Sequence, residues 1–339
     1  MKRNGDIDFI KGVAIFLMVF AHAATYWTPF DPIKWWIALF HMPVFFMATG
    51  YFFKREYVVS IKGCWHFMLR KVAHLWWPYV ASAIVCIVLQ NLLIDCNIYT
   101  DNVEFMTNAP APWNHLMNRL EWSDICRRIW HTFLLRDGSQ LVGSMWFVKT
   151  LFFASICYGS LSWIVQRTKA NYLFAMSSVC LGLALFARYF YQGDYVLNYI
   201  DGQRTFLAIV LIHLGFCMRE FGVKKILNSS KISVVILLGS AMVLIAARCL
   251  GTFISLSSHR VSSVISLLLV SFIGWMMLYS LSRISENTPQ IFRGTVRYMG
   301  RHSFSILIFH ILAFRIVNGF GVLLLRDPLY MIAGNPTAY

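Results

Sequence analysis

Long apolar runs recur along the chain, and short polar or basic segments separate them. Nine runs have about the length that an α-helix needs to cross the hydrocarbon core of a membrane, roughly 20 residues. They lie near residues 8–28, 34–53, 75–93, 146–165, 171–191, 204–218, 232–250, 261–281 and 302–324. Backbone N–H and C=O groups in lipid must be satisfied internally, so we predict that each run forms a helix.

The composition places this chain in a membrane. Of its 339 residues, 58% are hydrophobic and only 13% are charged, whereas soluble domains carry about 25% charged residues. Such a chain cannot cover its own surface with polar groups, and lipid must cover it instead. We predict an all-α, polytopic transmembrane helical bundle. No linker or internal repeat divides the sequence, so a single domain, 1–339, is expected.

The formal charge of the chain is +15. Its basic residues are unequally divided between the two sides of the membrane, so the charge does not indicate a nucleic-acid partner. If the N-terminus is cytoplasmic, seventeen Lys and Arg residues fall in cytoplasmic segments and seven in outer ones. Four of those seven lie in one long segment, 94–144, where the charge rule is weakest. The positive-inside rule therefore predicts a cytoplasmic N-terminus.

The first run resembles a signal peptide in its basic start and its short apolar core. Against this, Asp6 and Asp8 place acid in the leading segment, and apolar residues continue past Ala23. We predict a retained helix.

Ionisable residues inside a predicted span are functional candidates, because lipid makes them costly. Lys11 and His22 lie eleven residues apart, about three helical turns, and so share one face of the first helix. Asp8 precedes Lys11 by three residues and can pair with it. The alternative is a Lys that reaches the membrane interface and a His bonded to a neighbouring helix.

His41 in the second run lies two residues before Pro43. We expect it at a depth similar to His22, so that antiparallel neighbours could bring the two imidazoles together. Equally, a His beside a proline kink can bond the backbone carbonyls that the kink frees. The sequence leaves both interpretations open.

Two segments between the spans carry aromatic and polar residues together. Arg70, Lys71 and His74 follow Trp65 in a basic segment, which suits either an interfacial amphipathic helix or an anionic cofactor. The long segment Ile94–Ser144 combines tryptophans with polar residues. This mixture suits either sugar faces or an aromatic belt at the membrane interface.

Together these elements resemble the acyltransferase-3 family of integral membrane O-acyltransferases, across nearly the whole chain and in order. The stretches that carry the resemblance are 8–14 leading to His22, 40–46 through Gly50, Arg70-Lys71 to Pro78-Tyr79, Ser144-Met145-Trp146-Phe147-Val148, Leu214-Gly215-Phe216, and Gly300 to His310.

The chain departs from the family pattern at three points. Lys11 stands where the family usually has Arg, and the family's Arg-x-x-Arg is here Lys71 to His74. Lys keeps the positive charge but lacks the bidentate fork of Arg. The family commonly has ten helices or more, so we expect nine to ten spans.

The resemblance implies a membrane acyltransferase that moves an acyl group, usually acetyl, from acetyl-CoA or another acyl-CoA to a hydroxyl of a saccharide or lipid-linked glycan. His22 would be the general base or the acyl carrier, and His41 would orient His22 or stabilise charge. The cofactor would be bound by Lys11, Arg70, Lys71 and His74, and the substrate channel would be lined by Asp8, Trp146 and His310.

No metal is expected, and the expected location is the cell membrane, as in the bacterial cytoplasmic membrane. The alternative class is a multipass transporter or flippase with a central polar pathway.

Overall fold

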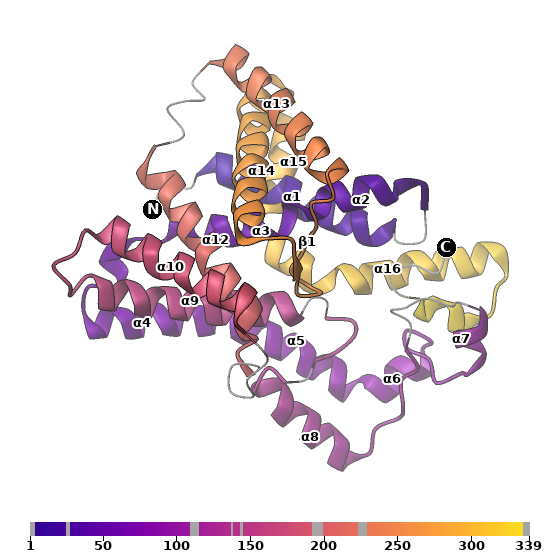
Figure 1. Ribbon diagram of the computed structural model, residues 1–339. Helices are drawn as coiled ribbons and strands as arrows, with labels where there is room; N and C mark the ends of the chain where they lie inside the picture. The colour runs from indigo at the N-terminus through magenta and orange to yellow at the C-terminus, as the bar shows by residue number, and fades with distance from the viewer. Residues whose placement is uncertain are drawn as a thin grey trace. The chain divides into compact units, whose positions relative to one another are not determined.

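The computed structural model describes residues 4–24, 28–108, 115–136, 138–142, 145–191, 199–222 and 229–334. Almost all of the regular structure in these residues is helical (Figure 1), which confirms the predicted all-α fold. The α-helices are α1 (Gly5–Ala23), α2 (Asp31–Ala38), α3 (His41–Phe52), α4 (Ile61–Lys71), α5 (Trp77–Val88), α6 (Gln90–Asp95), α7 (Glu104–Asn108), α8 (Trp122–Phe133), α9 (Met145–Val165), α10 (Tyr172–Tyr189), α12 (Gly202–Glu220), α13 (Ser230–Cys249), α14 (Val264–Ile284), α15 (Gln290–Arg301) and α16 (Ser303–Leu325).

Shorter elements join the helices. In the described residues, the 3₁₀ turns are η1 (Thr28–Phe30), η2 (Arg55–Val58), η5 (Ser285–Asn287) and η6 (Leu329–Ala333), and η3 (Val72–Trp76) is a π-helical turn. The strands β1 (Ile254–Ser255) and β2 (Arg260–Val261) pair antiparallel in a small hairpin, with Ile254 opposite Val261.

Seven helical stretches in the described residues are long and apolar enough to cross a membrane. They overlap seven of the nine predicted runs and are Thr28–Phe52, Ile61–Val88, Trp146–Val165, Tyr172–Tyr189, Ser230–Cys249, Val264–Asn287 and Ser303–Leu325. The chain is therefore an integral membrane protein with several apolar helices.

The remaining two runs correspond to α1 and α12, which are not among these seven stretches. Three charged residues lie within α1, namely Asp6, Asp8 and Lys11, and α12 has an arginine near each end. Most side chains of α12 are buried by protein, so this helix does not have to present an apolar surface to lipid. A total of nine to ten spans and a cytoplasmic N-terminus stay predictions.

The chain divides into two compact units, and each combines separate stretches of sequence. Unit 1 contains the chain up to Met18, Pro32–Leu75 and Trp146–Ser303. Unit 2 contains Val19–Asp31, Trp76–Met145 and the chain from Phe304 onward. Whether 1–339 behaves as the single domain expected from the sequence stays a prediction.

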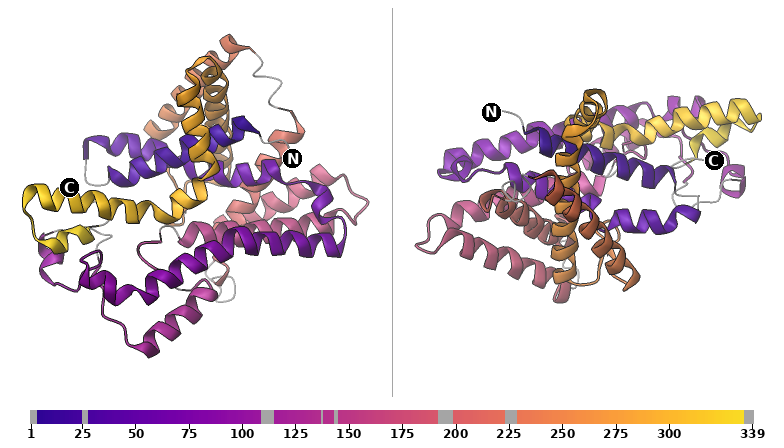
Figure 2. Two further views of the ribbon diagram at one scale, coloured as in Figure 1. Left: turned by 180° about the vertical axis from the view of Figure 1, so that it is seen from behind. Right: turned by 90° about the horizontal axis from the view of Figure 1, so that it is seen from above.

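In unit 1, α12 packs against α3, α10 and α14, and α13 lies along α14 (Figures 1 and 2). Glycine allows α3 and α12 to cross closely. A Cβ atom at Gly50 would overlap the carbonyl oxygen of Ile212, and one at Gly215 would overlap that of Met47. Any larger residue at either position would force these helices apart.

The crossing of α1 with α15 in unit 1 follows the same rule. A Cβ atom at Gly12 would overlap the carbonyl oxygen of Val296, and one at Gly300 would overlap that of Asp8. The glycine that begins the last family-like stretch is thus explained by close backbone contact.

The described residues of unit 2 contain two apolar clusters. The larger contains Ile94, Tyr99, Leu141, Ile311 and Phe314, and the smaller contains Phe105, Tyr330 and Ala333. The described part of the segment after α6 is also held by polar side chains. Gln90 donates to the carbonyl of Asn118 at 2.7 Å, and Asn91 donates to that of Leu120 at 2.9 Å.

Candidate functional site

Unit 1 contains a cavity of about 380 Å³, which is within the size range of small-molecule sites. Three residues predicted to bind the cofactor, Arg70, Lys71 and His74, line it together. The remaining lining residues are Thr49, Phe52, Phe53, Tyr57, Phe67, Leu75, Ser155, Tyr158 and Ile212. The structure therefore brings the predicted twin-basic positions to one cavity.

The local winding of the chain places these three basic residues. Ser60 caps α4 by accepting a hydrogen bond from the backbone N–H of Gly63 at 3.0 Å. The helix then widens into the π-turn Val72–Trp76 before α5 begins. Pro78 has no N–H to donate to the carbonyl of His74, four residues earlier. Single π-turns often occur at functional sites, and this one contains His74.

The cavity is basic and aromatic, and among the described residues that line it none is acidic. The guanidinium of Arg70 lies 4.7 Å from the ring centre of Tyr57, and the ammonium of Lys71 lies 5.2 Å from that of Phe67. Neither cation forms an ion pair with an acidic residue in the described part of the chain. Their charge is thus available to an anionic ligand, for which Arg and Lys are common partners.

Ser155 adds a polar group to the apolar part of this cavity. Its side chain is only 2% exposed, and its hydroxyl has no hydrogen-bond partner among the described residues. A buried polar group without a partner costs about 1–3 kcal/mol. A ligand group that bonds to this hydroxyl would remove that cost.

Behind the cavity wall lies a polar network centred on the buried His213 of α12. The Nδ1 atom of His213 is 3.1 Å from the hydroxyl of Tyr158, and its Nε2 atom is 2.9 Å from the hydroxyl of Ser177. The Sγ atom of Cys217 lies 3.5 Å from the same Nε2. None of these residues was predicted from the sequence as part of a site. An ionisable residue inside an apolar run, as His213 is, was the signal that could have found them.

In unit 2, the structure brings His22 of α1 and His310 of α16 together. His22 Nδ1 lies 3.1 Å from His310 Nε2, and the two ring centres are 5.1 Å apart. His310 is 4% exposed, and its Nδ1 lies 2.8 Å from the carbonyl oxygen of Leu307. Two residues predicted for different parts of the site, one for chemistry and one for the channel, are therefore direct partners.

His41 bonds within its own segment. Its Nδ1 lies 2.8 Å from the carbonyl oxygen of Ile37, four residues earlier. The carbonyl of Ile37 also accepts from the backbone N–H of Phe40 at 3.2 Å, whereas Pro43 would free the carbonyl of Leu39, four residues before it. Both interpretations of His41 therefore stay open. An action of His41 on His22 stays a prediction.

Asp8 is buried in unit 1, with its Oδ2 atom 3.4 Å from Nε of Arg301. Asp8 thus helps to attach α1 to α15. Its expected pairing with Lys11, which is partly exposed, and a place for either residue in a channel or cofactor site stay predictions. Trp146 is partly buried, and the guanidinium of Arg204 lies 5.3 Å from the centre of its ring.

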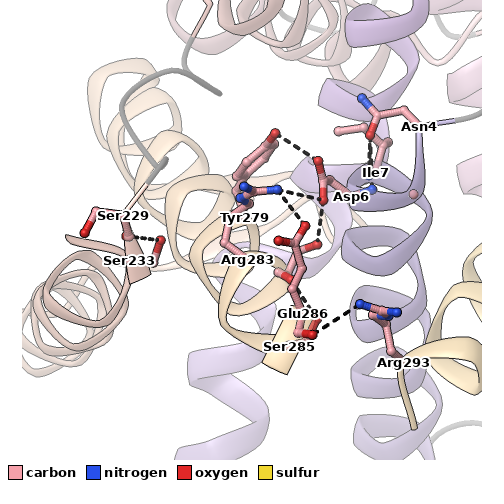
Figure 3. A network of polar contacts seen from close by, with 12 residues as sticks. Asn4, Asp6, Ile7, Ser229, Ser233, Tyr279, Arg283, Ser285, Glu286 and Arg293 are labelled. Carbon is pink, nitrogen blue, oxygen red and sulfur yellow. Dashed lines mark hydrogen bonds and ion pairs between the residues drawn. The ribbon is translucent and has the colours of Figure 1, made fainter. Parts of the chain in front are cut away.

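A second buried carboxylate on α1, that of Asp6, was not selected from the sequence. Figure 3 shows Tyr279 and Arg283 of α14 directed toward it. The Tyr279 hydroxyl donates at 3.2 Å, the Ser282 hydroxyl donates at 3.3 Å, and an Arg283 nitrogen lies 3.9 Å away. The start of α1 is thus attached to α14 by a network that is satisfied within the protein, which indicates a structural function.

Fold and site together define a helical integral membrane protein with a basic, aromatic cavity and a hydrogen-bonded histidine pair. The family model of the acyltransferase domain, acyltransferase-3, matches residues 4–337. The chain belongs to this family and is a membrane acyltransferase. No curated protein and no solved structure matches it significantly.

Proposed function

We propose that this protein is a membrane O-acyltransferase that moves an acyl group, in the simplest case acetyl, from acyl-CoA to a hydroxyl of a saccharide or lipid-linked glycan. The observation that carries the proposal is the cavity of unit 1. It combines aromatic walls with two cations that form no ion pair, and a buried hydroxyl that has no partner, among the described residues. The chain belongs to an acyltransferase family.

An acyl-CoA donor has chemical groups that match this cavity. Its phosphates are anionic and suit Arg70 and Lys71, with His74 beside them. Its pantetheine arm is largely apolar, which suits the aromatic walls, and carries amide groups that the hydroxyl of Ser155 could bond. The cation of Lys11, in the same unit, is proposed as a further contact for the donor.

The acceptor hydroxyl is a poor nucleophile and needs a base. We assign this function to His22, which removes the hydroxyl proton while the oxygen attacks the thioester carbonyl. The carbon–sulfur bond then breaks, and CoA leaves as a thiolate that takes up a proton. In the alternative route, a ring nitrogen of His22 attacks the thioester carbonyl first, and CoA leaves as a thiolate. The hydroxyl oxygen then takes the acyl group from the ring, and the freed ring nitrogen takes up the hydroxyl proton, which passes to the CoA thiolate. Both routes need an unprotonated nitrogen on His22.

The proposed location is the cell membrane, as in the bacterial cytoplasmic membrane, with the N-terminus inside. CoA is then available to the cytoplasmic basic segments, and glycan acceptors are available on the other side. Asp8, Trp146 and His310 are proposed along the path of the acceptor or acyl group, and His41 as a second histidine acting on the charge near His22.

The test is acyl transfer in membranes that contain the protein. Membranes given acetyl-CoA labelled in the acetyl group should transfer label to a glycan fraction, and a mild base should release it as acetate because the product is an ester. Matched membranes with His22→Gln should transfer none. Label that crosses the membrane without becoming esterified would contradict the proposal and favour a transporter.

A further inference from the structure

The contacts of His310 determine which of its nitrogens carries the proton. A carbonyl oxygen only accepts hydrogen bonds, so the Nδ1 atom that lies 2.8 Å from the Leu307 oxygen must carry a hydrogen. In the neutral ring the other nitrogen, Nε2, is then an acceptor. His310 therefore faces its partner with a lone pair.

This arrangement fixes the protonation of His22 in turn. Its Nδ1 atom lies 3.1 Å from the accepting Nε2 of His310, and a hydrogen bond between them requires the hydrogen on His22 Nδ1. The neutral ring of His22 then has its lone pair on Nε2. The opposite arrangement would require a doubly protonated His310, and charging a side chain that is 96% shielded from solvent is costly.

We propose that His310 is a positioning residue, which holds His22 in the tautomer with hydrogen on Nδ1 and so presents Nε2 as the base or acyl-accepting atom. The proposal rests on the proposed function of His22. It assigns His310 an action on His22, in addition to its proposed place along the path of the acceptor or acyl group.

The chain of hydrogen bonds also accommodates the product of proton transfer. When Nε2 of His22 takes a proton from the acceptor hydroxyl, the resulting imidazolium keeps its Nδ1–H bond to His310, now strengthened by charge. The positive charge stays on the ring of His22, which is only partly buried, because a second proton on the buried ring of His310 would be costly. The low dielectric of the interior strengthens the hydrogen bond between the two rings.

Packing holds the ring of His310 for this task. The ring of Phe314, four residues later on α16, meets it edge to face with centres 5.8 Å apart. Phe314 also belongs to the main apolar cluster of unit 2. The orientation of His310 is therefore fixed by the core and by its own helix, while His22 is only partly buried.

The direct test is nitrogen NMR of histidine-labelled protein in lipid nanodiscs, with His22 assigned by comparison with His22→Gln. Ring nitrogen shifts distinguish the two neutral tautomers. We expect His22 to carry hydrogen on Nδ1 in the parent protein and a mixture of tautomers in His310→Leu. His302→Leu, at the exposed junction of α15 and α16, is the matched control and should leave the His22 signals unchanged. Hydrogen on Nε2 of His22 in the parent protein would overturn the proposal.

Kinetics provide the second readout. His310→Leu should lower kcat by about 10-fold to 1000-fold, within the contribution of a positioned base, and leave the donor KM unchanged. His310→Gln should keep a larger share of kcat, because its side-chain oxygen can accept from His22 Nδ1. Equal kcat in His310→Leu and the parent protein would refute positioning. If the parent protein transfers no acyl group, the proposed function fails, while the NMR result still decides the tautomer.

Discussion

The hydroxyl of Tyr158 and the Nδ1 atom of His213 lie 3.1 Å apart, and both side chains are buried. Tyr158 lines the cavity on its other side. One residue thus joins the wall of the proposed donor site to a polar network within the helices of unit 1. The shape of the cavity and the stability of this unit should therefore depend on the same hydrogen bond.

Tyr158→Phe tests this dependence. It removes the hydroxyl and leaves a nitrogen of His213 without that partner, which should lower the free energy of unfolding by about 1–3 kcal/mol. Thermal unfolding of purified protein in detergent measures the effect as a fall in Tm. Tyr189→Phe, which alters an exposed tyrosine, is the control and should leave Tm unchanged. Equal Tm values for both variants would show that the bond contributes little.

The paired substitution Arg70→Ala and Lys71→Ala should weaken donor binding. A hydrogen bond to a charged group contributes about 1.5–3 kcal/mol, so the donor KM should rise by about tenfold or more, with the acceptor KM little changed. Steady-state kinetics with varied acyl-CoA provide the measurement. Lys62→Ala removes an exposed cation from α4 that does not line the cavity, and should have no such effect. If the donor KM is unchanged in the double variant, these cations do not bind the donor and serve only to orient the chain in the membrane.

Ser155 offers a sharper test of the cavity because unit 1 contains a close match for it. Ser280 is also buried, and its hydroxyl also has no partner among the described residues, but it does not line the cavity. Ser155→Ala should raise the donor KM by about threefold to tenfold, the range of one hydrogen bond. Ser280→Ala should leave it unchanged. The same KM change in both variants would exclude a direct contact between Ser155 and the donor.

The hairpin of β1 and β2 should be sensitive to pH through His259, which lies outside the apolar helices. Its Nε2 atom is 3.8 Å from Asp201, and Arg204 is the neighbouring cation. Burial and the positive charge of Arg204 lower the pKa of His259, and Asp201 offsets part of that effect.

The sign of this dependence follows from linkage. A lowered pKa means that the folded state resists protonation, so the stabilisation is present above the ordinary histidine pKa of about 6.5 and is lost as pH falls through the lowered pKa. Tm should therefore fall between pH 7.5 and 5.5 by more in the parent protein than in His259→Asn. Parallel Tm curves for the two proteins would contradict this assignment.

Several features of the fold were predictable from the sequence because they depend on local periodicity and composition. The apolar runs predicted where the helices lie. His22 and His310 were each predicted as site residues because each is an ionisable residue within such a run, but nothing linked one to the other. Arg70, Lys71 and His74 lie close together in sequence, so their common cavity follows from a single segment.

The pairing of distant residues was not predictable in the same way. His22 and His310 are 288 positions apart, and no periodicity connects α1 with α16. The sequence suggested a similar depth in the membrane for His22 and His41, but depth does not determine which helices are neighbours, and it gave no sign of the contact between His22 and His310. The Asp6 network also depends on tertiary contact, because Tyr279 and Arg283 belong to α14.

His22→Gln should abolish acyl transfer while the protein still folds and inserts. Gln is similar in bulk to His and can bond to His310, but it cannot exchange a proton near neutral pH or carry a labile acyl group. A general base contributes about 10²–10⁴ in rate, so the activity left in labelled-acetyl assays should be below about one per cent. Binding of CoA, measured by calorimetry, should be retained, since the cavity residues belong to unit 1. If the variant keeps more than about a tenth of the parental activity, His22 has a structural function, and His41 becomes the next candidate for the base.

If activity is lost, rapid quenching of the parent protein with acetyl-CoA and no acceptor decides between the two routes, because only an acyl carrier retains label on the protein.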